Sequence, residues 1–114
     1  MSVKMTPRQV GDVTVVDAVG RITLGDGASA FRDTIRELAN SGQKKLLLNL
    51  AEVSYIDSSG IGEMVSGFTT VTNQGGQVKL LNLTKRVQDL LQITKLYTVF
   101  EVFDDEATAV RSFS

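Results

Sequence analysis

The sequence contains no cysteine and no histidine among its 114 residues. Without a thiol there is no disulfide framework and no thiolate nucleophile. Without an imidazole there is no Ser-His-Asp triad and no histidine that could act as a general acid or base. Zinc sites depend largely on these same two residue types. We therefore expect no triad or histidine-based catalysis, no zinc site, and no metal or other cofactor.

An excess of charge of one sign is also lacking. Twelve lysines and arginines balance thirteen acidic residues, for a net charge of −1, so nothing draws the chain toward nucleic acid. No apolar run approaches the roughly 20 residues that a membrane-spanning helix needs, and the first seven residues lack the apolar core of a signal peptide. We expect one domain, residues 1–114, in the cytoplasm, with no nucleic-acid partner and no direct membrane insertion.

Strand-like and helix-like segments alternate along the chain. Alternating apolar and β-branched residues predict strands at 3–10, 13–19, 45–50, 77–81 and 98–103. Helical spacing predicts helices after residue 27, at 58–73, after Thr84 and after Asp104, which are expected as N-caps of the last two. The order β-β-α-β-α-β-α-β-α predicts an α/β fold with a mostly parallel central sheet. Pro7 confines the first strand to an antiparallel edge.

The segment DSSGIG, residues 57–62, joins a buried strand to a helix. Sheets of this kind place their sites at the carboxyl ends of the strands. Asp57 is predicted to cap the helix, which puts Ser58 and Ser59 in a first turn whose N–H groups favour an anion. Gly60 and Gly62 lack side chains, so we expect another surface to approach closely there.

Three interpretations of this segment compete. The first is an ordinary helix start, because aspartate and serine are common at N-caps. The second is a nucleophile elbow, but that motif reads Gly-x-Ser-x-Gly and no histidine is present to activate the hydroxyl. The third is a modification site, because a phosphoryl group brings about −1.5 to −2 charges that a helix N-terminus tolerates.

The string LNLAEVSYIDSSGIG, residues 48–62, the order of elements and the chain length resemble STAS domains. The resemblance runs over nearly the whole chain and is greatest to the single-domain anti-sigma factor antagonists of bacteria. It implies a regulator that is not an enzyme and that, when unphosphorylated, binds an anti-sigma factor and so releases a sigma factor. It also implies that this partner is a serine kinase of the histidine-kinase-like ATPase fold, with a serine phosphatase as a further partner.

The resemblance implies that Ser59 is the phosphoacceptor, with Ser58 as the alternative. The partner-binding surface would then consist of Asp57, Ser58, Ser59, Gly60, Ile61 and Gly62. A second interpretation within the same family is a scaffold subunit of a larger assembly, such as a stress-signalling complex or an inner-membrane lipid-transport complex.

One loop departs from the family pattern. Many members have Gly-x-Leu-Asp before the first helix, whereas this chain has GRITLGDG at residues 20–27, which we expect to form a loop. Arg21 and Asp26 are therefore candidate partner-binding residues, although the favoured role of Asp26 is to cap the first helix. Tyr97, Phe100 and Phe103 are expected in the core, and exposed members of this group could support a homodimer.

Overall fold

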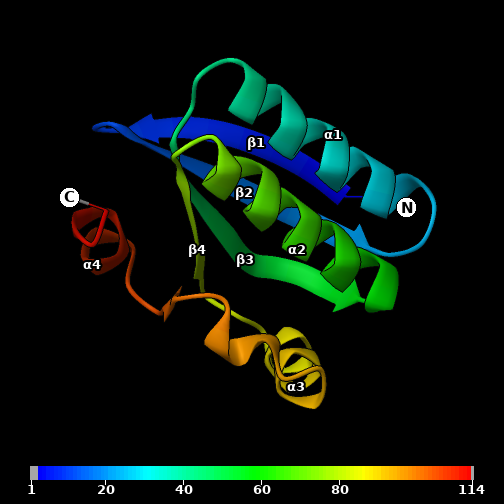
Figure 1. Cartoon of the computed structure of the whole chain (residues 1–114). Coiled ribbons are helices and arrows are strands. Elements are labelled where there is room, and N and C mark those ends of the chain that lie inside the picture. The colour runs from blue at the N-terminus through cyan, green and yellow to red at the C-terminus, as the bar shows by residue number, and fades with distance from the viewer. Residues whose placement is uncertain (1–2, 114) are drawn as a thin grey trace.

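The computed structural model describes residues 3–113 and shows an α/β fold built on one mixed sheet. Within these residues it has five strands and four α-helices (Figure 1). In chain order the elements are β1 (Val3–Val10), β2 (Val13–Ile22), α1 (Asp26–Asn40), β3 (Lys45–Ile56), α2 (Ser58–Asn73), β4 (Gln77–Leu81), α3 (Lys85–Ile93), the 3-10 helix η1 (Leu96–Thr98), β5 (Val102–Phe103) and α4 (Glu106–Arg111).

The sheet has the spatial order β1-β2-β3-β4-β5. β1 pairs antiparallel with β2, and every later pairing is parallel. This confirms the predicted fold class, with Pro7 exposed on the edge strand β1. Because sequential strands are neighbours, the carboxyl ends of β2, β3 and β4 meet at one edge of the sheet.

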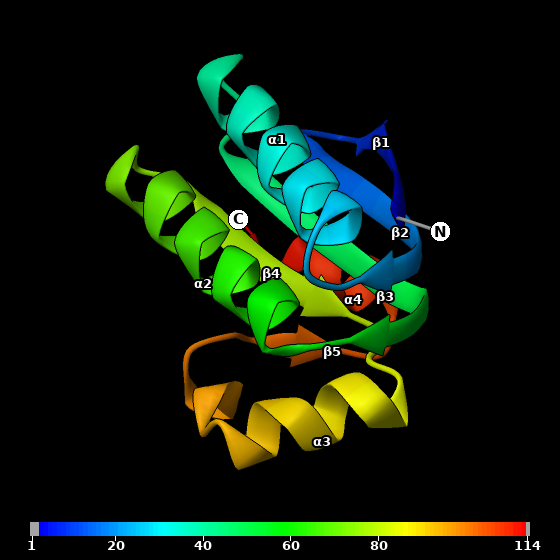
Figure 2. The same cartoon turned by 90° about the vertical axis from the view of Figure 1, so that its right-hand side faces the viewer.

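Helices cover the two faces of the sheet unequally. Figures 1 and 2 show α1 and α2 side by side on one face, α4 on the opposite face and α3 beside the β5 edge. The larger core lies under α1, α2 and α3, and centres on Phe31, Leu48, Met64 and Leu80. A smaller core lies under α4 and contains Val13, Val15, Leu47, Leu81, Ala109 and Phe113. β3 contributes side chains to both cores, which explains why its apolar residues form a continuous run.

Two strands are longer than predicted. β2 continues through Ile22, in the stretch expected to be a loop, and β3 continues to Ile56. The two ends pair with each other, Arg21 with Tyr55 and Ile22 with Ile56. Both isoleucines are buried, so apolar burial extends the sheet to the point where α2 begins.

Three further predictions, two of them in the carboxyl-terminal part of the chain, need correction. Only Val102–Phe103 form the last strand, because η1 and a left-handed backbone at Lys95 occupy the chain before it. Asp105, not Asp104, caps α4 and accepts the Thr108 N–H. In α1 the N-cap position belongs to Gly25, with a φ of 99°, and Asp26 is the first helical residue without a capping bond. The predicted cap at Thr84 is confirmed.

The described helices can be compared with the length and hydropathy that a membrane-spanning helix needs. None of those within residues 3–113 is long and apolar enough to cross a bilayer.

Candidate functional site

The strand-to-helix junction formed by Asp57, Ser58, Ser59 and Gly60, here called the serine corner, lies at the carboxyl end of β3. Asp57 has an extended backbone and is the N-cap of α2, as predicted. One carboxylate oxygen, Oδ1, accepts the Gly60 N–H at 3.0 Å. The other, Oδ2, accepts the Leu24 N–H at 3.0 Å. The same side chain therefore starts α2 and fixes the loop between β2 and α1.

The charge of Asp57 is stabilised by these contacts. The backbone N–H of Leu24, and then that of Gly60, hold the pKa of its carboxyl below the usual range. At neutral pH the group is a carboxylate with both oxygens engaged. It serves as an anchor for the corner and has little remaining capacity to accept a proton from a neighbouring hydroxyl.

The two glycines of the segment differ in their surroundings. A Cβ atom at Gly60 would overlap the carbonyl oxygen of Ile22, and the Ile56 side chain would crowd it. A Cβ at Gly62 would meet nothing within 4 Å. Gly60 thus lets the first turn of α2 pack against β2, whereas Gly62 is exposed. The expected close approach of another surface is available at Gly62 but not at Gly60.

The serines face two sides of the helix terminus. Ser58 is exposed and Ser59 is partly exposed, and among residues 3–113 neither hydroxyl has a hydrogen-bond partner. Glu63 lies one turn after Ser59, and its Oε2 atom is 3.7 Å from Nη1 of Arg32 in α1. Ser59 is therefore on the side of α2 that faces α1. Ser58 is on the other side and borders a hollow toward α3.

The remaining candidates take different places. Ile61 is only 4% exposed, so it supports the corner from below and contributes little to its surface. Arg21 is exposed at the end of β2, and its backbone pairs with Tyr55 beside the corner. Asp26 is exposed at the start of α1. The structure therefore gathers Asp57, Ser58, Ser59 and Gly62 at the surface, with Arg21 and Asp26 on neighbouring elements.

A hollow of about 380 Å³ adjoins the serine corner. We call it the α3 groove; it is lined by Tyr55, Ile56, Asp57, Ser58, Arg86, Asp89, Leu90 and Ile93. The Arg86 guanidinium lies over the Tyr55 ring, 4.2 Å from its centre. Ile93 is 76% exposed at the end of α3.

Sequence reasoning missed the α3 groove. One residue could have indicated the groove from the sequence. Ile93 is an isoleucine that lies outside the apolar stripe formed by Val87, Leu90 and Leu91 on a short amphipathic helix.

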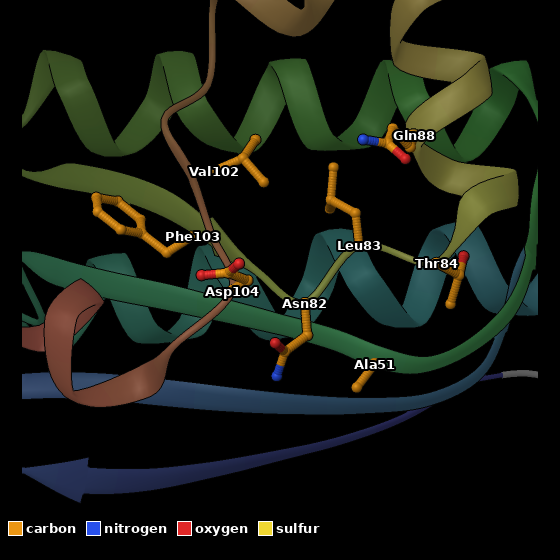
Figure 3. A pocket seen from close by; sticks show the side chains of 8 residues that line it. All are labelled: Ala51, Asn82, Leu83, Thr84, Gln88, Val102, Phe103 and Asp104. Carbon is orange, nitrogen blue, oxygen red and sulfur yellow. The ribbon is translucent and has the colours of Figure 1, made fainter.

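A larger and more open hollow, of about 590 Å³, lies at the carboxyl end of β4. Figure 3 shows its lining side chains spread over β3, the connection from β4 to α3, α3 itself and β5, with Leu83 near its middle. Its lining residues include no lysine or arginine. It therefore offers no cation to a phosphate, and it does not contain the serines.

Comparison with known proteins defines the class of this chain. The family model described as "STAS domain" matches residues 4–109. The chain belongs to the STAS domain family.

Relatives and solved structures agree with this assignment. An anti-sigma-B factor antagonist of Bacillus subtilis strain 168 is 33% identical over 102 residues, which cover 90% of this chain and 92% of that protein. The crystal structure of an anti-sigma factor antagonist from Mycobacterium paratuberculosis superposes with a TM-score of 0.87 at 17% identity, covering 98% and 94% of the two chains.

A third similarity is to SpoIIAA, an anti-sigma factor antagonist from Bacillus. The unphosphorylated form gives a TM-score of 0.71 at 18% identity, covering 96% of each chain. The phosphorylated form gives 0.76 at 18% identity, covering 97% of this chain and 100% of that one. At these identities the structures support the fold alone.

Proposed function

We propose that this chain is an anti-sigma factor antagonist that is switched by phosphorylation of Ser59. In the unmodified form it binds an anti-sigma factor that is also a serine kinase of the histidine-kinase-like ATPase fold, and a sigma factor is released. The observation that carries the proposal is the serine corner: two accessible hydroxyls without hydrogen-bond partners among residues 3–113, on the first turn of a helix anchored by Asp57. The names of the relatives support the role.

The corner suits a modification better than catalysis. A nucleophilic serine needs a base within hydrogen-bond reach, and both oxygens of Asp57 already accept backbone N–H groups. A phosphoryl group needs only space and a favourable field. The N-terminus of the 16-residue helix α2 supplies partial positive charge at this position.

The consequence of phosphorylation would be local. A dianion at Ser59 places a hydrated charge where the partner must dock, and burying it without a cation costs several kcal/mol. Since about 1.4 kcal/mol lowers affinity tenfold, this is enough to end binding. The fold need not change, which agrees with the similarity of this chain to both forms of SpoIIAA.

The test is incubation of the purified chain with each serine kinase of this fold from the source organism, with Mg-ATP, read by intact mass. We expect wild type and Ser58→Ala to gain one phosphoryl group and Ser59→Ala to gain none. A phosphatase specific for phosphoserine should reverse the gain and restore binding. Phosphorylation of Ser59→Ala but not of Ser58→Ala would move the site to Ser58.

A stable assembly that co-purifies with the chain, with both serines unmodified after kinase treatment, would contradict the switch and favour the scaffold role.

A further inference from the structure

The surface beside the serine corner carries an apolar group and a free cation together. Of the large apolar side chains that are exposed within residues 3–113, Leu24, Tyr55 and Ile93 lie around the corner. Leu24 and Ile93 are 80% and 76% exposed, more than any other large apolar residue in that part of the chain. Exposed apolar residues that cluster around one feature mark an interaction site.

Arg86 is the cation of the α3 groove. Its neighbour Lys85 bonds to Asp89 at 3.2 Å, and the Asp57 carboxylate is held by backbone N–H groups. Among the described residues Arg86 has no carboxylate partner. The groove therefore contains one cation, and its two carboxylates, Asp57 and Asp89, bond to other groups.

The stacking of Arg86 on Tyr55 fixes how this charge is presented. The guanidinium carbon lies over the ring, 4.2 Å from its centre, and a guanidinium placed over a ring keeps the N–H groups that point away from it free. Those N–H groups match the two oxygens of a carboxylate, which they bind in parallel. The stack also limits the motion of a long side chain, so less conformational entropy is lost when a partner binds.

We propose that the anti-sigma factor docks an acidic side chain and an adjacent apolar side chain into the α3 groove. The carboxylate pairs with the edge of Arg86, and the apolar side chain packs on Ile93 and the exposed part of Tyr55. This inference rests on the proposed function, because it names the surface and the partner chemistry through which the unmodified chain is recognised.

The groove also explains why phosphorylation would act against this partner. Ser59 faces the α1 side of α2, whereas Arg86 lies across the groove that Ser58 borders. A phosphate on Ser59 is therefore not placed to be neutralised by Arg86, and its charge repels an acidic partner segment approaching the same corner. Attraction at Arg86 would favour docking of the unmodified chain, and the charge of the phosphate at the corner would oppose it in the modified chain.

The test measures binding of the unmodified chain to the kinase that phosphorylates it, by calorimetry in the presence of ADP, which allows no phosphoryl transfer. Arg86→Glu should weaken binding by tenfold or more, as expected for a reversed charge at an interface. Arg36→Glu is the matched control, because Arg36 is exposed on α1 and has no ion-pair partner among the described residues. That variant should bind within about twofold of wild type.

The apolar part of the groove is tested in the same way. Ile93→Thr should weaken binding about tenfold, and Val19→Thr should not, because Val19 is exposed on β2 away from the groove. An acid-to-lysine substitution in the kinase that restores binding to Arg86→Glu, but not to Ile93→Thr, would identify the paired carboxylate. Thermal unfolding of each variant should match wild type, which separates lost contacts from lost folding.

The outcomes distinguish the two proposals. If the wild-type chain binds and is phosphorylated but Arg86→Glu and Ile93→Thr bind equally well, the groove proposal is wrong and the switch stands. If the wild-type chain neither binds nor is phosphorylated by any such kinase, the proposed function fails and the groove proposal fails with it.

Discussion

Helices α2 and α4 both begin with an aspartate at the N-cap, yet their surroundings use polar groups in opposite ways. At α2 the Asp57 carboxylate is satisfied, but the hydroxyls of Ser58 and Ser59 have no partner within residues 3–113. At α4 the Asp105 carboxylate accepts both the N–H and the hydroxyl of Thr108. The two helix starts have the same type of N-cap residue, but only α2 has neighbouring hydroxyls that are not bonded within these residues.

The region around α4 is closed by ionic contacts. Arg8 of β1 pairs with Asp17 at 2.7 Å and with Glu106 of α4. The buried Lys79 donates to the carbonyl and the hydroxyl of Ser112 at 2.9 and 3.0 Å. Polar groups that bond within the molecule hold α4 on the sheet, whereas those at the serine corner are available for recognition. The comparison shows that two helix starts with the same N-cap residue differ in whether the neighbouring polar groups are bonded within residues 3–113.

The largest effect is expected where the frame of the serine corner is tightest. Gly60→Ala places a Cβ against the carbonyl oxygen of Ile22 and should destabilise the fold by about 3 kcal/mol. The matched variant Gly62→Ala meets no neighbour and should stabilise the helix by about 0.5–1 kcal/mol. Urea unfolding of both variants measures the difference. Equal stability of the two would contradict the packing of α2 against β2.

The next effect tests whether the polar contacts that hold α4 on the sheet are structural. Lys79→Met keeps the apolar stem but leaves the Ser112 carbonyl without its donor, at an expected cost of about 1–2 kcal/mol. Lys85→Met removes an exposed i,i+4 pair on α3 and should cost at most about 0.5 kcal/mol. Urea unfolding of the two variants should show this order. A loss at Lys85 as large as that at Lys79 would remove the distinction between buried and exposed pairs.

A smaller difference in stability is expected between variants that lack one of the two N-cap aspartates, Asp57 or Asp105. Loss of an N-cap costs about 0.5–2 kcal/mol, and Asp57→Ala should fall at the upper end because its carboxylate also holds Leu24. Asp105→Ala should fall at the lower end, since α4 has only 6 residues. Hydrogen exchange gives the diagnostic: the Leu24 amide should lose protection in Asp57→Ala and keep it in Asp105→Ala. Retained protection in both variants would contradict the role of Asp57 as an anchor for the loop.

Much of this comparison could be predicted from the sequence. The strand and helix order, the Asp57 and Thr84 caps and the place of the serines at the helix start all follow from local patterns. The full lengths of β2 and β3 could not be predicted from local patterns, because Arg21 and Tyr55 pair only when two segments that are distant in the sequence are aligned. The α3 groove was missed for the same reason, since Arg86 acquires its orientation from Tyr55, 31 positions earlier in the sequence.

The smallest effect concerns pH. Hydrogen bonds from Arg8 lower the pKa values of both Asp17 and Glu106. A lowered folded-state pKa means that the unfolded chain binds more protons, so the stabilisation is complete above the unfolded values of about 3.9 and 4.3. It is lost as the pH falls through the lower folded values. Arg8→Gln should therefore cost less than about 1 kcal/mol at pH 7, because these pairs are partly exposed, and the cost should shrink as the pH falls through the folded-state values.

The Asp57 carboxylate should titrate in the same acidic range for a different reason. Its pKa is lowered by backbone N–H groups of Leu24 and Gly60, which Arg8→Gln leaves in place. Acid unfolding of Arg8→Gln should therefore keep part of its pH dependence, and Asp57→Ala should remove that part. High salt separates the contribution of the Arg8 ion pairs from that of Asp57. In 1 M NaCl the Debye length is about 3 Å, so the Arg8 pairs should weaken. The backbone hydrogen bonds of Asp57 should respond little, and an equal salt response at both sites would show that charge alone holds the serine corner.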